Sequence, residues 1–220
     1  MSFPPGSTLM RRIMRAVFYL LYHPFAFTYD LIAATVSLGR WKDWVYSIIP
    51  FIEGTRLLEL GHGPGHLQRI LRDHGLATVG LDESAPMGTL AKERLRKSGH
   101  SNINLVRAIS QNLPFPDRSF QTVVSTFPSE YIFDPRTLVE VRRCLFDGGR
   151  LVVLPVAWHV GQKVVERFLA WLFHFTGESP RLDEVILEHI WRPIEQAGFQ
   201  VEIKKIEVKS SLLLIIIAVK

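Results

Sequence analysis

Apolar and polar residues follow each other along the chain in short blocks that predict strands and helices in turn. The runs that predict strands are 56–60, 78–82, 103–108, 122–125, 150–155, 200–208 and 212–219. Apolar residues at helical spacing predict helices at 65–74, 85–97, 135–145 and 182–197. The early strands are apolar almost throughout, which is typical of parallel strands that are covered on both faces.

This alternation predicts an α/β fold with a doubly wound, seven-stranded, Rossmann-like sheet. The sheet should be mostly parallel, but only Lys209-Ser210-Ser211 separates the last two strands, so these should form an antiparallel hairpin. Everything before about residue 50 is expected to be an appended helical cap. We therefore predict a cap at 1–50 and the main domain at 51–220.

Composition narrows the class of protein. The chain has 220 residues, of which 47% are hydrophobic, enough for one substantial core. Cys144 is the single cysteine, so no internal disulfide is expected. His62 and His66 both lie in a loop, where a histidine is expected to pack or form hydrogen bonds rather than bind a metal, so no metal site is predicted. The formal charge of +5 is mild and the basic residues are dispersed, so we expect no nucleic-acid partner. No uncharged stretch is long enough to span a membrane, and we expect a cytoplasmic protein.

The N-terminal segment favours two interpretations. On a helix, Leu9, Ile13 and Val17 share one face, and Arg11, Arg12 and Arg15 fall on the other. This pattern is typical of a peripheral helix at an anionic inner-membrane surface. It also fits a helix whose aliphatic face packs on the domain, with the arginines in solvent.

A glycine loop carries the strongest functional signal. Gly61, Gly63 and Gly65 follow a strand that ends in Glu59-Leu60, and a helix follows them. Backbone N–H groups and a helix N-terminus at such a place accept a close ligand. The third glycine of the dinucleotide fingerprint would fall on His66, which disfavours a nicotinamide cofactor. Asp82 ends the next strand, where a carboxylate can accept the hydroxyls of a ribose.

At these residues the chain resembles the class I S-adenosylmethionine-dependent methyltransferases. The matching segments are "LLELGHGPG", "VGLDESAPM", "LPFPDRSFQTVVSTF" and "LFDGGRLVVLP". The segment "YDLIAATVSLGRWKDW" is similar to a region of the ubiquinone and menaquinone biosynthesis C-methyltransferases (methyltransferase type 11). The resemblance implies S-adenosyl-L-methionine as cofactor. It implies a small, apolar or lipid-like methyl acceptor, such as a quinol or a phospholipid head group.

The resemblance also implies roles for single residues. Glu59 would interact with the amino group of the cofactor, the three glycines would contact its methionyl part, and Asp82 would hold its ribose. An aspartate usual near the adenine is replaced by Ile109, so the adenine neighbours become Ser110 and Gln111. The remaining cofactor contacts implied are Tyr29, Glu83, Met87 and Thr126.

Methyl transfer from a sulfonium needs alignment more than side-chain chemistry. A base is required only if the acceptor must lose a proton, and Tyr131 and His159, each after a central strand, are the candidates. An aromatic stretch at 157–181 fits a helix packed on the sheet or a lid over an apolar acceptor. Two other classes stay open, a nicotinamide-dependent oxidoreductase and a non-catalytic protein that retains a methyltransferase fold.

Overall fold

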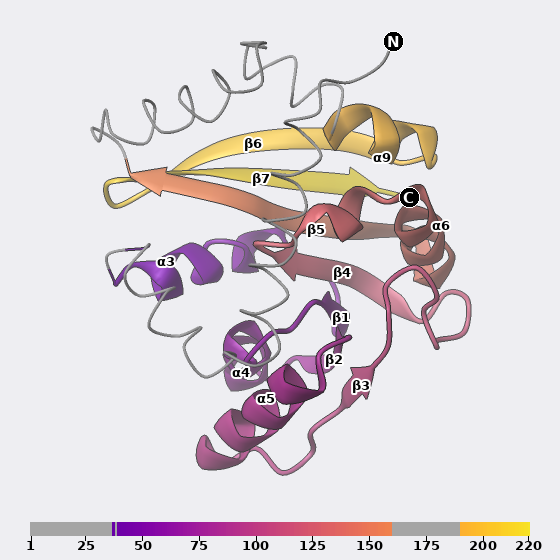
Figure 1. Ribbon diagram of the computed structural model, residues 1–220. Coiled ribbons are helices and arrows are strands. Elements are labelled where there is room, and N and C mark those ends of the chain that lie inside the picture. The colour runs from indigo at the N-terminus through magenta and orange to yellow at the C-terminus, as the bar shows by residue number, and fades with distance from the viewer. Residues whose placement is uncertain (1–36, 38, 160–189) are drawn as a thin grey trace, which may run out of the picture.

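A seven-stranded sheet forms the centre of the computed structural model, which describes residue 37 and residues 39–159 and 190–220 (Figure 1). In spatial order the strands are β3 (Leu105–Arg107), β2 (Ala77–Asp82), β1 (Arg56–Leu60), β4 (Phe120–Thr126), β5 (Leu145–His159), β7 (Ser211–Val219) and β6 (Gln200–Val208). The pairs from β3 to β5 are parallel, whereas β7 runs antiparallel to both β5 and β6. The predicted fold class, with its C-terminal hairpin, is confirmed.

Helices cover both faces of the sheet and create two cores. The helices are α3 (Trp41–Tyr46), α4 (His66–Asp73), α5 (Ala85–Lys97), α6 (Pro135–Cys144) and α9 (Arg192–Gln196), with 3₁₀ turns η2 (Ile49–Phe51) and η3 (Glu130–Phe133). Successive residues of β4 serve opposite faces, because side chains alternate along a strand. Val123 packs into the core under α6 and α9, and Val124 into the core under α3 and α4. The helix α3 thus packs on the sheet, while the division of the chain near residue 50 stays a prediction.

Several elements have the bounds that the sequence pattern predicts, and side-chain caps explain where two of the helices begin. Strands β1 and β6 and helix α5 have the predicted bounds. The side chain of Ser84 accepts a hydrogen bond from the Met87 N–H and caps α5, and Asp134 caps α6 by accepting from the Arg136 N–H. Such caps satisfy N–H groups that have no partner inside the helix.

Strand β5 is longer than predicted at both ends. Its first residue, Leu145, pairs with Phe120, and an irregularity follows before Thr122 pairs with Arg150. At the other end, the register with β7 shifts between Val153 and Val156, where Pro155 stands. A bulge tolerates proline because no ladder hydrogen bond is required of it there. Strand β3 is shorter than its predicted range, and the part of the predicted last helix before residue 190 lies outside the described residues.

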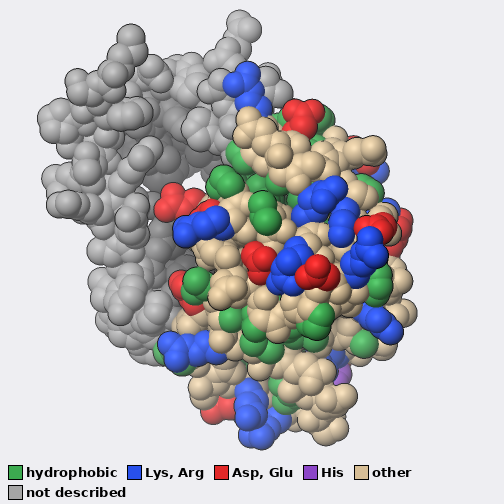
Figure 2. Space-filling view, turned by 90° about the vertical axis from the view of Figure 1, so that its right-hand side faces the viewer, with side chains coloured by type: hydrophobic (Ala, Val, Ile, Leu, Met, Phe, Trp, Pro, Cys, Tyr) green, Lys and Arg blue, Asp and Glu red, His purple; other side chains and the backbone are tan. Residues whose placement is uncertain are grey.

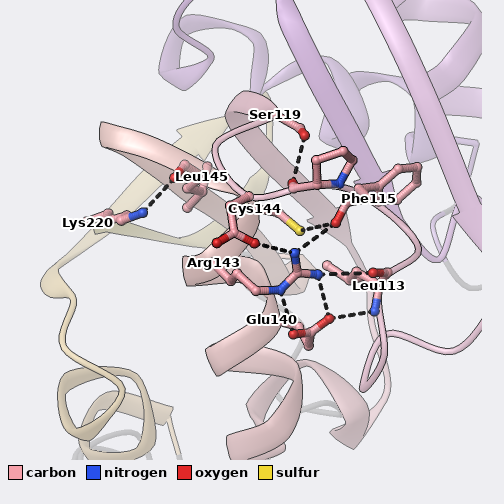
Figure 3. A network of polar contacts seen from close by, with 10 residues as sticks. Leu113, Phe115, Ser119, Glu140, Arg143, Cys144, Leu145 and Lys220 are labelled. Carbon is pink, nitrogen blue, oxygen red and sulfur yellow. Dashed lines mark hydrogen bonds and ion pairs between the residues drawn. The ribbon is translucent and has the colours of Figure 1, made fainter.

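An ion-pair network fixes the loop between β3 and β4 (Figure 3). Arg143 of α6 donates to Glu140 and Asp117 at 2.8 Å each, and to the backbone oxygens of Leu113 and Phe115 at 3.0 and 2.8 Å. The Leu113 N–H completes the network by donating to Glu140 at 2.8 Å. Because Arg143 lies beside Glu140, the pKa of that carboxyl falls below its usual range. The network ties to α6 the loop that begins with the predicted adenine neighbours.

The surface on the side of α6 and the C-terminus carries both charges in a mixed pattern. Figure 2 shows Lys and Arg side chains interspersed with Asp and Glu on this face, with only scattered hydrophobic side chains. Some exposed charges of the protein pair directly, such as Arg118 with Asp147 at 2.8 Å. Within the described residues, no helix is long and apolar enough to cross a membrane, and no group of side chains is arranged to bind a metal ion.

Candidate functional site

The candidate site lies at the carboxyl edge of the sheet, where β1 and β4 are neighbours. The chain leaves β1 toward β2 and β3 but leaves β4 toward β5, so this is the point where the strand order reverses. Open α/β sheets bind their ligands at such a point. A small pocket opens here, and it is lined by Trp41 and Val45 of α3, by Glu59, by the glycine loop and by Thr126.

Backbone hydrogen bonds hold the glycine loop against the end of β2. The N–H groups of Gly61 and His62 donate to the Leu81 oxygen at 2.7 and 3.2 Å, and the Gly65 N–H donates to the His62 oxygen at 2.9 Å. All three glycines have left-handed backbone, with φ of 70°, 50° and 81°. Residues with a side chain rarely adopt that conformation, so the sequence had to place glycine here.

The glycines differ in what a side chain would meet. A Cβ on Gly65 would lie 2.8 Å from the Cβ of Ala91 on α5, so this glycine permits the contact between α4 and α5. A Cβ on Gly61 would collide with the hydroxyl of Tyr131. A Cβ on Gly63 would meet none of the described residues within 4 Å. Gly63 therefore leaves its backbone uncovered by this part of the chain, which is what a ligand that touches the main chain requires.

Glu59 is a buried carboxylate with a free oxygen. Its side chain is 2% exposed, and its Oε2 atom forms no hydrogen bond among the described residues. Burial raises the pKa of Glu59 well above its usual range; Gln68 opposes this shift and Asp82 adds to it. A buried anion without a partner is unfavourable. The site is therefore short of one cation or hydrogen-bond donor beside Glu59.

Asp82 ends β2 and ties the glycine loop to the next helix. Its carboxylate accepts the N–H groups of Gly63 and Ser84, each at 2.8 Å. An ionised carboxylate has about four acceptor positions, so both oxygens keep capacity for the hydroxyls of a ligand. Asp82 therefore both holds the glycine loop in place and remains accessible to a ligand, since it is 9% exposed.

His62 lines the pocket but is itself buried. Its ring is 4% exposed, and its Nδ1–H donates to the Gly63 oxygen at 2.7 Å. Burial lowers the pKa of His62, although the nearby charge of Asp82 opposes the shift. The neutral ring therefore acts as a buried brace of the loop.

The two candidate bases, Tyr131 and His159, differ in how far the structure describes their side chains. The Tyr131 hydroxyl lies 3.1 Å from both the Leu60 oxygen and the Ser125 hydroxyl, and Ser125 also donates to Leu60 at 2.7 Å. These contacts place the Tyr131 hydroxyl under Gly61, where it supports the loop. His159 is the last residue of β5 and pairs with Ser211 through the backbone, and its side chain lies outside what the structure describes.

The other predicted residues surround this edge to different degrees. Glu83 is exposed, whereas Met87 is fully buried at the start of α5. Ser110 is buried and accepts a hydrogen bond from Thr137 at 3.2 Å, and the Gln111 amide donates to Asp134 at 3.3 Å. Tyr29 lies outside the described residues.

Ile109 and Thr126 complete the predicted set. Ile109 is 50% exposed and lies two residues after the end of β3. Thr126 ends β4 and lines the pocket. An apolar side chain thus stands free at the edge, next to the predicted adenine neighbours.

Sequence reasoning missed the buried amide of Gln68 and the strained backbone of Phe127. Phe127 follows β4 with φ of 50° just before Pro128, and its ring lies 4.3 Å from that of Trp41 and 6.1 Å from that of Trp44. A non-glycine residue in this conformation is held by its surroundings and is often found at functional sites. The aromatic signal was visible in the sequence, but its meeting with Trp41 depends on the folded chain.

Comparisons with known proteins relate this chain to methyltransferases. A model of the methyltransferase domain family matches residues 58–153. The ubiquinone/menaquinone biosynthesis C-methyltransferase UbiE of Pectobacterium atrosepticum is 30% identical over 175 residues, which are 76% of this chain and 68% of that protein. The demethylmenaquinone methyltransferase of Thermotoga maritima is 32% identical over 140 residues, 61% of this chain and 59% of that protein. The chain therefore spans roughly two thirds of the length of such curated relatives.

A solved structure shows the same fold. The phosphoethanolamine N-methyltransferase 2 of Haemonchus contortus, in complex with S-adenosyl-L-methionine, aligns with a TM-score of 0.63 at 18% identity. The alignment covers 89% of this chain and 56% of that one.

Proposed function

The chain belongs to the class I S-adenosylmethionine-dependent methyltransferases, in the type 11 group, and we propose that it methylates a small, apolar, quinol-like acceptor. Two findings support this acceptor. The curated relatives are named for ubiquinone, menaquinone and demethylmenaquinone. The aromatic rings of Trp41 and Phe127 pack together beside Thr126, and aromatic side chains favour flat apolar ligands.

The cofactor fits the residues at the edge, and the observation that carries this assignment is the free oxygen of the buried Glu59. S-adenosylmethionine carries an ammonium and a sulfonium, and a carboxylate beside them lowers the energy of both. We assign Glu59 to the ammonium end, Asp82 to the ribose, and the backbone of Gly63 to the part between them. Ser110 and Gln111 would lie at the adenine end, with the exposed Ile109 in place of the usual acid.

The protein's part in the reaction is alignment. The bound cofactor would supply a methyl carbon on a sulfonium; the acceptor atom would bond to that carbon in line as the carbon–sulfur bond breaks, with the neutral thioether S-adenosylhomocysteine as the leaving group. Holding the two reactants in this line while excluding water contributes several kcal/mol without a covalent step. Tyr131 acts on the loop rather than on the acceptor, because its hydroxyl already bonds Leu60 and Ser125. His159 remains the candidate base for an acceptor that must lose a proton.

A methyl-transfer screen with labelled cofactor tests this proposal. Purified full chain is incubated with methyl-labelled S-adenosylmethionine and, in parallel, with a short-chain demethylmenaquinol analogue or with phosphoethanolamine, and the products are identified by mass spectrometry. We expect label on the quinol ring and none on the amine. Label on phosphoethanolamine alone would favour the head-group reaction instead. Binding of NAD without binding of S-adenosylmethionine would favour the oxidoreductase.

We also propose that the N-terminal segment attaches the enzyme to an anionic membrane surface, where an apolar acceptor is found. Arg11, Arg12 and Arg15 support this, because each basic residue near anionic lipid contributes about 1 kcal/mol. Co-sedimentation with anionic liposomes should be stronger for the full chain than for a chain lacking residues 1–20. Equally weak sedimentation of both at low salt would favour packing of the segment on the domain.

A further inference from the structure

Three buried polar side chains form a line beneath the glycine loop. Thr78 of β2, Gln68 of α4 and Glu59 of β1 are exposed by 2%, 0% and 2%. The Thr78 hydroxyl donates to the Gln68 Oε1 atom at 2.9 Å. Because this bond occupies the amide oxygen, the amide nitrogen of Gln68 is the group left for another partner.

A glycine makes room for this amide. Gly80 is the register partner of Glu59 in the parallel pair of β1 and β2. A Cβ on Gly80 would lie 3.1 Å from the Gln68 Cδ atom and from the His62 Cδ2 atom, and 2.8 Å from Leu105. A side chain at position 80 would therefore push Gln68 away from the strand that carries Glu59.

The amide nitrogen of Gln68 and the carboxylate of Glu59 are complementary hydrogen-bonding groups, and each has an unfilled hydrogen-bonding position. Among the described residues, neither Gln68 Nε2 nor Glu59 Oε2 forms a hydrogen bond. One is a donor and the other an acceptor, and both are buried, where a missing hydrogen bond is costly. Gln68 lies near enough to Glu59 to lower its pKa, against the larger effect of burial.

We propose that Gln68, held in orientation by Thr78, is a positioning residue that keeps the Glu59 carboxylate ionised and aimed at the ammonium end of the cofactor. The Gln68 N–H closes on the Glu59 Oε2 atom once the carboxylate is charged, and because an ionised carboxylate has about four acceptor positions, Oε2 keeps one of them for the ligand. This inference rests on the assignment of Glu59 proposed above.

Other titratable groups near Glu59 could also contribute to the pH dependence of binding. Asp82 at the end of β2 adds negative charge, which favours the protonated form of Glu59. His62, in the loop, has a pKa lowered by burial, so its ring contributes little positive charge near neutral pH. His66 lines the same pocket at the start of α4. The residues that α3 contributes to the pocket, Trp41 and Val45, are uncharged.

The proposal predicts that cofactor binding is linked to a proton. Below the raised pKa of Glu59 the free protein holds this carboxyl protonated, and a bound ammonium requires it ionised. Affinity should therefore fall as the pH falls, and binding should release a proton to the buffer. Loss of the Gln68 amide raises the pKa of Glu59 further. As the pH is lowered, the affinity for the cofactor should therefore begin to fall at a higher pH than in the wild type.

Titration calorimetry with S-adenosylhomocysteine from about pH 5.5 to 7.5 tests this, below the pKa of roughly 7.7–8.0 that an α-amino group has. Gln68→Leu should weaken binding on the order of tenfold at the acid end, the lower end of what one hydrogen bond to a charged group contributes, and less at pH 7.5. Thr78→Val should also weaken binding most at the acid end, and Thr78→Ser should restore the wild-type dependence of affinity on pH. Methylthioadenosine, which lacks the ammonium, should bind all variants with a flat profile.

Two controls separate the possible failures. Thr122→Val removes an equally buried threonine hydroxyl, which bonds the Glu53 backbone at the opposite edge, and should leave the profile unchanged. Glu59→Gln should weaken binding and abolish its pH dependence. If Glu59→Gln binds like the wild type, the assignment of Glu59 fails. If Glu59→Gln is impaired but Gln68→Leu and Thr78→Val lose affinity equally at every pH, or not at all, only the positioning role fails.

Discussion

Replacement of Gly63 by alanine should separate binding from folding. A Cβ at this position would meet no atom of residues 39–159 or 190–220 within 4 Å, so the substitution creates no steric clash with this part of the protein. Its φ of 50° is still left-handed, which disfavours alanine by roughly 1–2 kcal/mol. We expect a folded protein whose melting temperature falls by about 2–4 °C per kcal/mol lost, as for other domains of this size.

The effect on the cofactor should be much larger than the effect on the fold. The new methyl group would stand where a ligand must approach the bare backbone. A ligand displaced from that position loses its contact with the loop and about one hydrogen bond to a charged group, roughly 2–3 kcal/mol. We therefore expect the affinity for S-adenosylhomocysteine to fall about 30- to 140-fold, since about 1.4 kcal/mol corresponds to a factor of ten.

The assay compares thermal unfolding and titration calorimetry with a matched glycine. Gly99 also has left-handed backbone, with φ of 84°, and a Cβ added to it would also contact no described residue within 4 Å, but it lies in the turn after α5. Gly99→Ala should lower the melting temperature similarly and leave the affinity unchanged. Wild-type affinity in Gly63→Ala would refute the reasoning, because the loop would then be a turn that no ligand touches.

Three further changes test other parts of the site and its support. Asp82→Ala should weaken cofactor binding by about 1–3 kcal/mol in calorimetry and also lower the melting temperature, because the Gly63 N–H loses its acceptor; unchanged affinity would exclude the ribose role. Tyr131→Phe should keep turnover within about tenfold of wild type, since the hydroxyl supports the loop, and a drop to the uncatalysed rate would instead identify a base. Arg143→Met should destabilise the fold by roughly 2 kcal/mol at pH 7 in urea unfolding. That difference should shrink as the pH falls through the lowered pKa of Glu140, where the wild type loses the same ion pair; a constant difference would mean that packing alone is affected.

Local signals made much of the fold predictable. Helix α5 could be placed because Ser84 caps it and Pro86 follows in its first turn, and both features act within a few residues. The extension of β5 past Pro155 could not, because proline normally argues against a strand. It depends on pairing with β7, which lies some sixty residues further along the chain and shifts register at the proline.

The residues of the candidate site also divide into those that the sequence predicted and those that only the folded chain reveals. The meeting of the glycines, Glu59 and Asp82 at one edge of the sheet was predictable, because each stands at the end of a parallel strand or in the loop that follows it. Gln68 was not, because a polar residue on an amphipathic helix is normally assigned to the solvent face. Only the absence of a side chain on Gly80, across the sheet register from Glu59, reveals the space that Gln68 occupies.

The contact between Gly61 and Tyr131 restricts the order in which this site can diverge. The Tyr131 hydroxyl occupies the place of a Cβ on Gly61, so alanine at position 61 is excluded while the tyrosine is present. A lineage that first exchanges Tyr131 for a smaller residue frees this place, and alanine at position 61 then faces only the strain of its backbone. The reverse order passes through an intermediate with a steric clash at the end of β1. Homologues that have lost this glycine should therefore also lack the tyrosine, whereas the loss of the tyrosine alone should be tolerated.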